Sequence, residues 1–94
     1  MDYTFIAPQK SPAGDLDYSM SWDDWLAEGE TITAFAVICQ DDTITLDRTS
    51  ASATDVRWWL TGGVKSRRYS VAVTIVTSAG RSDVRTVLVA VGDR

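Results

Sequence analysis

The side chains that could do chemistry in this sequence are few, because its 94 residues contain no histidine and a single cysteine, Cys39. Histidine is the commonest general base and the commonest metal ligand. Without it, neither a serine triad nor a cysteine–imidazole pair can be built. The glycines Gly62, Gly63 and Gly80 do not form a phosphate-binding loop, and we expect them to lie in turns. We therefore expect a protein that is not an enzyme.

Carboxylates remain as the chemical candidates. Clustered carboxylate oxygens can hold a hard cation such as calcium. The sequence has three acidic pairs, Asp15/Asp17, Asp23/Asp24 and Asp41/Asp42. None has the spacing of a calcium-binding loop, so we expect solvated or capping carboxylates, and neither a metal nor another cofactor. Paired acids for glycoside hydrolysis need a cleft, which a domain of this size rarely offers.

Length and composition indicate one domain of ordinary globular character. No run approaches the roughly 18 apolar residues of a membrane span, and the first residues lack the pattern of a signal peptide. Cys39 cannot form an internal disulfide, and we expect it to be a small core residue. These features fit a protein that is made in a reducing cytosol and is not inserted in a membrane.

Charge is distributed unevenly along the chain. Residues 1–47 hold ten acids and one base, a net −9, whereas residues 48–94 hold eight bases and three acids, a net +5. One interpretation is that the two halves neutralise each other within a single fold. The other is that opposite charges lie on opposite faces, so that several copies pack head to tail in a symmetric assembly. A net charge of −4 without a basic, aromatic stripe argues against a nucleic-acid partner.

The strongest structural pattern lies in residues 68–91. Tyr69, Val71, Val73 and Ile75 share one parity, which is the period of a half-buried strand. Residues 78–81 form a turn signal, and Val87, Val89 and Val91 alternate on the returning segment. The pattern predicts a long antiparallel hairpin whose apolar face needs a second layer, because an isolated hairpin is marginally stable.

Four further strands are expected before the hairpin. Alternation predicts strands around residues 16–20, 44–46 and 56–60, with Trp58 facing the core and Trp59 facing outward. Residues 31–39 are apolar on both parities, which favours a central strand covered on both sides, or a bulged one. Residues 48–55 are either a loop or a weak edge strand.

The spacing of apolar residues changes after residue 20 from every second residue to a helical one. Trp22, Trp25 and Leu26 stand at i, i+3 and i+4. With Ser21 as N-cap and Gly29 as a stop, the spacing predicts one short helix over residues 22–28. Its two tryptophans are expected to close one end of the core. The alternative is that they are exposed and bind protein or sugar.

Residues 1–14 contain two prolines and Gly14, and we expect an extended N-terminal arm there. Tyr3, Phe5 and Ile6 are either part of a frayed terminus or a docking segment for a partner or neighbouring copy. Residues 15–94 then form the folded domain.

Short strands separated by turns every 8–12 residues predict an all-β fold, an antiparallel β-sandwich of the immunoglobulin or fibronectin type III kind. Tyr69 opens the penultimate strand, where such folds place a corner tyrosine. The candidate partner-binding residues are those expected on the arm, at the tryptophan-rich end and on the outward face of the strand at 56–60. They are Tyr3, Phe5, Ile6, Trp22, Trp25, Arg57 and Trp59.

Nearly the whole chain resembles a family of small bacteriophage proteins, the fiber-tail adaptors. The resemblance is carried by Pro8-Gln9-Lys10-Ser11-Pro12, Leu16-Asp17-Tyr18, Trp22-Asp23-Asp24-Trp25-Leu26, Gly29-Glu30-Thr31-Ile32, Trp58-Trp59-Leu60-Thr61-Gly62-Gly63 and Ser78-Ala79-Gly80-Arg81. It implies a structural virion protein of the phage tail or neck, made in the host cytoplasm. Such a protein would be present in several copies and would join the tail to the fibre or to adjoining tail proteins.

Two other functions fit the same residues. An exposed tryptophan platform would suit a carbohydrate-binding sandwich. An immunoglobulin-like module could also decorate a phage head.

Overall fold

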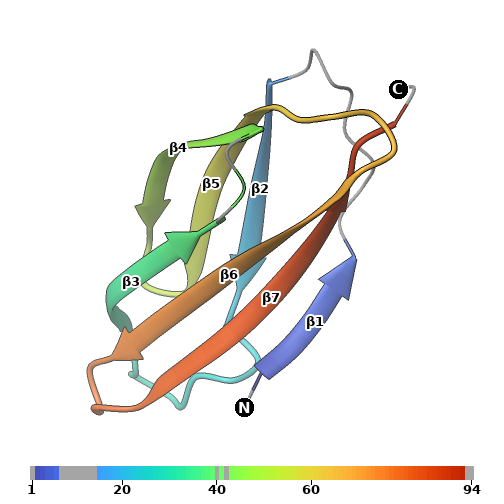
Figure 1. Cartoon of the computed structure of the whole chain (residues 1–94). Coiled ribbons are helices and arrows are strands. Elements are labelled where there is room, and N and C mark those ends of the chain that lie inside the picture. The colour runs from blue at the N-terminus through green and yellow to red at the C-terminus, as the bar shows by residue number, and fades with distance from the viewer. Residues whose placement is uncertain (1, 7–14, 40, 42, 93–94) are drawn as a thin grey trace.

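The computed structural model describes residues 2–6, 15–39, 41 and 43–92, and for residues 2–6 and 15 it describes the backbone only. This part of the chain forms strands and turns, and it contains no helix long and apolar enough to cross a membrane. The strands make two sheets that face each other, ordered β1-β7-β6-β3 and β2-β5-β4 (Figure 1). Their bounds are β1 Asp2–Ile6, β2 Asp15–Ser21, β3 Ile32–Ile38, β4 Ile44–Ala51, β5 Asp55–Gly62, β6 Arg68–Thr77 and β7 Ser82–Ala90.

The predicted hairpin is confirmed as β6 and β7, which pair from Arg68–Ala90 to Val76–Ser82. Tyr69, Val71, Val73 and Ile75 all point into the core, as do Val87, Val89 and Val91. Gly80 takes a φ of 78° in the connecting turn. A residue with a Cβ rarely adopts such a positive φ, which explains why position 80 is a glycine.

The second sheet covers the hairpin with the inner face of β5. Val56, Trp58 and Leu60 are fully buried, and the Trp58 ring stacks on Tyr18 of β2 at 6.1 Å between ring centroids. Trp59 is only partly buried. The predicted parity of the two adjacent tryptophans is therefore confirmed, and the core is formed by side chains from both layers.

The first described segment of the expected arm is a strand at the edge of the hairpin sheet. β1 pairs in parallel with β7, with Tyr3 opposite Arg85 and Phe5 opposite Val87. Residues 7–14 lie outside the described residues, so the division into an arm and a domain at residue 14 remains a prediction.

The expectation of a central strand at residues 31–39 is wrong. In the described residues β3 is one of the two edge strands of its sheet, pairs only with β6, and is exposed over most of its length. The bulge that was the alternative is present, because the pairing shifts between Ile32 and Ala34. An apolar run on both parities shows that charges are missing from a strand, but it does not show that both faces are covered.

The predicted helix over residues 22–28 is also wrong. The Trp22 carbonyl accepts from the N–H groups of Trp25 and Leu26, which completes a single turn. Ser21 does cap that turn, because its hydroxyl accepts from the Asp23 N–H at 3.2 Å. The next N–H, that of Ala27, donates to the Glu30 carboxylate at 2.9 Å, so the backbone ladder stops there.

Residues 48–51 turn out to belong to an edge strand, the end of β4, which pairs with β5 through a second bulge between Asp47 and Ser50. Arg48 has a φ of 48° at this bulge. A bulge twists the edge of a sheet and limits further pairing.

Tyr69 ties the start of β6 to two loops. Its hydroxyl accepts from the Val64 N–H at 2.7 Å and shares a hydrogen bond of 2.8 Å with the Thr43 hydroxyl. Tyr69→Phe removes both bonds and leaves a part-buried N–H without this acceptor. We expect a loss of about 1–2 kcal/mol in the free energy of unfolding, measured by urea denaturation. An unchanged midpoint would show that these bonds do not stabilise the fold.

Gly63 and Gly80 form a matched pair, because both have positive φ but only Gly63 is crowded. A Cβ on Gly63 would lie 2.8 Å from Val91 Cγ2, whereas a Cβ on Gly80 would meet nothing within 4 Å. Gly80→Ala should therefore cost roughly 1 kcal/mol from backbone strain alone, and Gly63→Ala roughly 2–4 kcal/mol. Thermal denaturation of both variants checks the order, and equal losses would contradict the crowding at Gly63.

Candidate interaction surfaces

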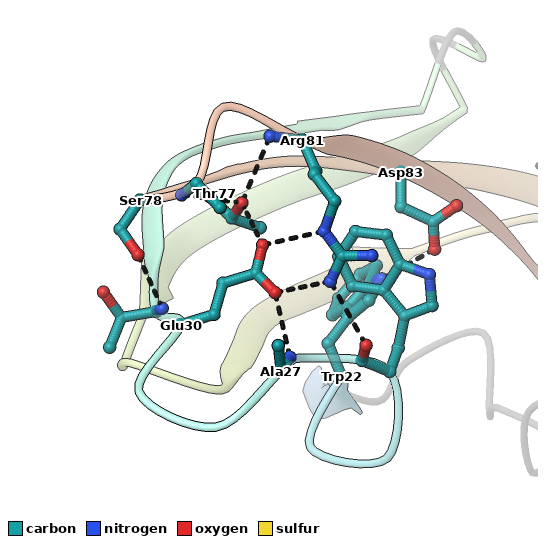
Figure 2. Close-up of polar contacts among 10 residues, drawn as sticks. Trp22, Ala27, Glu30, Thr77, Ser78, Arg81 and Asp83 are labelled. Atoms are coloured by element: carbon teal, nitrogen blue, oxygen red, sulfur yellow. Dashed lines mark hydrogen bonds and ion pairs between the residues drawn. The ribbon is translucent and has the colours of Figure 1, made fainter.

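One end of the sandwich is held by a buried carboxylate, that of Glu30, whose side chain is 3% exposed. Glu30 precedes β3, and its partners come from separate segments (Figure 2). Arg81 of the hairpin turn donates to both carboxylate oxygens, from Nε at 2.9 Å and from Nη2. Thr77 at the end of β6 and the Ala27 N–H donate to the same group. Such bidentate contacts fix the direction as well as the distance of the pair.

Arg81 also covers Trp25, with its guanidinium carbon 4.0 Å from the ring centroid. Its Nη2 donates to the Trp25 carbonyl at 3.3 Å. One cation therefore joins the hairpin turn to the 22–30 loop through a carboxylate, a ring and a backbone oxygen. This leaves Trp25 half-buried, with one face of its ring already occupied.

Trp22 is fully buried beside Trp25 and is held by a second charged pair. Its Nε1 donates to Asp83 at 2.9 Å, and Arg85 lies 3.5 Å from the same carboxylate oxygen. The Arg85 guanidinium is 4.7 Å from the Trp22 ring centroid and donates to the Ser21 carbonyl at 2.7 Å. Trp22 therefore closes the core, as one of the two sequence interpretations has it, and offers no surface to a partner in this structure.

Arg57 and Trp59 share the outward face of β5, in the middle of the second sheet. Trp59 lies between Asp17 of β2 and Asp47 of β4 in the strand register. The Arg48 guanidinium is 4.1 Å from the Trp59 ring centroid, and Arg57 lies 4.0 Å from the Asp17 carboxylate. The face thus combines one aromatic ring with alternating charges, and its polar side chains remain largely exposed.

A shallow hollow of about 240 Å³ adjoins Arg57 on this sheet. Ser19, Ser50 and Asp55 contribute to its lining. Aromatic residues and arginine are enriched at protein–protein interfaces, so Trp59 and Arg57 make this face a candidate binding surface.

The candidate residues of the arm are placed by their backbone only. Tyr3, Phe5 and Ile6 lie in β1, opposite Arg85, Val87 and Leu88 of β7. Their side chains lie outside the described residues. The structure thus brings Arg57 and Trp59 together on one face and Trp22 and Trp25 together at one end, as two separate regions.

Sequence reasoning missed a third surface, at the free edge of β3. Phe35 and Ile38 are 36% and 50% exposed, and Val76 on the neighbouring strand β6 is 40% exposed. Beside the end of β3 is a hollow of about 500 Å³ that Ile38, Ala72 and Arg68 help to line. The sequence did carry a signal, because residues 31–40 contain no charge. We interpreted that signal as burial.

None of these regions contains a cluster of acids and cysteine that could hold a metal ion, as far as the described residues show. The candidate acidic pairs occupy other roles. Asp41 accepts from the Thr43 hydroxyl and N–H, which lower its pKa below the ordinary value, and Arg67 lies 3.4 Å away. Asp17 pairs with Arg57, and Asp23 and Asp24 are exposed. Asp15 and Asp42 lie outside the described side chains.

Cys39 is half-buried against the core, and burial raises the pKa of its thiol. A raised pKa keeps the thiol protonated near neutral pH, and the protonated form is a poor nucleophile. Cys39 therefore lies at the margin of the core, just after β3, rather than inside the core as the sequence predicts.

Glu30 makes the stability of the fold depend on pH in the acidic range. Hydrogen bonds from Arg81, Thr77 and Ala27 lower the pKa of Glu30 from 4.5 to about 2, although desolvation opposes them. A carboxylate with a lowered pKa stabilises the fold fully above pH 4.5, and this contribution is lost as the pH falls toward 2.

We therefore expect Glu30→Gln to lower Tm clearly at pH 7, and the difference from the unaltered protein to shrink steadily between about pH 4.5 and pH 2. Thermal scans across this pH range measure it. Glu28→Gln, a change at an exposed position in the same loop, is the control and should leave Tm nearly unchanged. A Tm difference for Glu30→Gln that does not vary with pH would contradict the role of ionised Glu30.

The comparisons with known proteins bear on these surfaces. The family model described as "Podophage GP4 fiber-tail adaptor protein gp77" matches residues 10–90. Among curated proteins, no relative matches this chain. The matched segment contains both tryptophan-bearing regions, the hairpin and the edge strand β3.

Proposed function

Because this chain belongs to the podophage GP4 fiber-tail adaptor family, we propose that it joins the tail or neck of a phage particle to the fibre or to adjacent tail proteins. The match over residues 10–90 is the observation that carries this proposal. A structural tail protein works through its surfaces, so it needs a rigid body and exposed contact residues rather than a catalytic centre. We accordingly propose that the protein is not an enzyme.

The fold supplies a rigid body of this kind. Its two sheets enclose one core, and ion pairs and cation–π contacts of Arg81 and Arg85 close one end. The hydroxyl of Tyr69 bonds back to the N–H of Val64, five residues upstream, as a corner tyrosine does in immunoglobulin-like sandwiches. This contact supports an immunoglobulin-like fold, which we propose for the chain.

We propose the outward face of β5 as the main partner-binding surface. Trp59 and Arg57 belong to the residue types that dominate binding energy at interfaces. Both lie on a strand whose inner face is anchored by Trp58, which fixes their backbone positions, and the Arg48 guanidinium lies over the Trp59 ring before a partner arrives. Pre-organised contact residues lose little conformational entropy on binding. Trp22, in contrast, is committed to the core.

A double substitution tests this surface. Arg57→Ala combined with Trp59→Ala should reduce capture of tail proteins, or incorporation into particles, by at least about tenfold, because two central contact residues are removed. Quantitative pull-down from a phage lysate and immunoblotting of purified particles measure this. Tm should change little, because both side chains point away from the core.

Val64→Ala, which removes an exposed apolar side chain from the loop between β5 and β6, is the matched control and should leave capture unchanged. Normal incorporation of the Arg57/Trp59 variant would exclude this face. Absence of the unaltered protein from purified tails would exclude the adaptor function itself.

A further inference from the structure

The edge of β3 lacks the features with which edge strands normally avoid pairing. Charged residues, prolines and bulges protect such edges. At the edges of the other sheet, β2 carries Asp17, and β4 carries Asp47 and Arg48 with a bulge between Asp47 and Ser50. β3 has no charge or proline, and its bulge lies at one end, between Ile32 and Ala34.

The unpaired part of this edge is short and well bounded. The Ile32 N–H donates to the Ala53 carbonyl at 2.8 Å, so the loop before β5 covers the start of the strand. Within the part of the chain that the structure describes, Ala34 to Ile38 then pair with β6 on one side only. Alternate residues of an edge strand direct their N–H and C=O groups outward, so these five residues offer a backbone ladder to a further strand.

From this edge we infer that β3 pairs antiparallel with β3 of a second copy of the chain, about a two-fold axis at Ala36. No like charges oppose each other in this pairing, because residues 31–40 carry none. The register places Ile38 opposite Ala34 of the second copy, and Phe35 opposite its Val37. Each exposed large side chain thus meets a smaller one, and the hairpin sheet continues across the axis as one sheet.

The contact area determines how strong this pairing is. Five residues at about 3.4 Å each, across a sheet about 10 Å thick, give a contact plane of roughly 170 Å² per copy. A stable dimer buries about 800 Å² per partner. We therefore expect a weak pairing and assign it a dissociation constant on the order of 1 mM. Such a contact operates where copies are held close together, as on an assembled particle, because local concentration replaces affinity.

Charge variants at the axis test the inference on the purified chain. Ala36 is exposed on the outer face, so Ala36→Lys and Ala36→Glu should both fold normally by circular dichroism and Tm. Chemical-shift titration by NMR from about 0.05 to 2 mM, a range that brackets the expected dissociation constant, should show concentration-dependent shifts at residues 34–38 of the unaltered protein.

Each variant alone should associate at least about tenfold more weakly, because two like charges then oppose each other at the axis. An equimolar mixture of the two should associate at least as well as the unaltered protein. Thr45→Lys, on the outer face of the other sheet, is the control and should change nothing. Absence of any shift at 2 mM, or a mixture no better than its components, would overturn the inference.

A cross-link provides the second, independent measurement. Directly opposed residues in antiparallel strands have Cα atoms about 4.5–5.5 Å apart, within the range of a disulfide. The double variant Ala36→Cys, Cys39→Ser should form a disulfide dimer on oxidation, whereas Ser19→Cys, Cys39→Ser on β2 should not. Equal dimer yields from both would overturn the pairing.

Loss of pairing with retained capture of tail proteins would leave the adaptor function intact, so the two proposals fail separately.

Discussion

Mutual burial of two apolar strand faces is the constraint on which this structure depends. The hairpin β6–β7 buries seven valine, isoleucine and tyrosine side chains on one face if Val91, just beyond β7, is included. Among the described residues, that face is covered mainly by β5, through Trp58, Leu60 and Val56, and at one end by Trp22. Neither layer has a second apolar partner among the described elements. Because hydrophobic stabilisation follows the apolar area removed from water, each sheet stabilises the other.

Ion pairs within the fold join the acidic first half of the chain to the basic second half. Glu30 pairs with Arg81, Asp17 with Arg57 and Asp41 with Arg67, and each pair joins an acid of the first half to a base of the second. Of the three, only the Glu30–Arg81 pair has a buried member, and it also fastens the 22–30 loop to the hairpin turn. These contacts support the interpretation that the halves neutralise each other. Charge-driven packing between copies remains a prediction.

Sequence alone predicted the parts of the fold in which one side-chain period continues without interruption. The alternation in β5, β6 and β7 identified the strands and also the direction of Trp58 and Trp59, because strand geometry leaves no other choice. The prediction failed at residues 22–28, where the spacing of three side chains suggested a helix. There the Glu30 carboxylate, which lies beyond that window, takes the Ala27 N–H.

The failure at β3 has a different physical cause. The sequence shows that residues 31–40 carry no charge. This lack of charge fits a strand covered on both faces and equally fits an uncharged edge strand. Only the pairing pattern distinguishes them. Of the candidate site, the shared face of Arg57 and Trp59 followed from parity. The roles of Trp22 and Trp25 depended on contacts with Asp83, Arg85 and Arg81, which lie more than fifty residues away in the sequence.

Native-state hydrogen exchange tests the mutual dependence of the two sheets most directly. If each layer is stable only against the other, the amides of Trp58 and Leu60 in β5 should exchange with the same free energy as those of Val71 and Val73 in β6. That value should equal the global free energy of unfolding. A markedly lower free energy for β5 than for β6 would show that the second sheet opens while the hairpin persists, and would contradict this account.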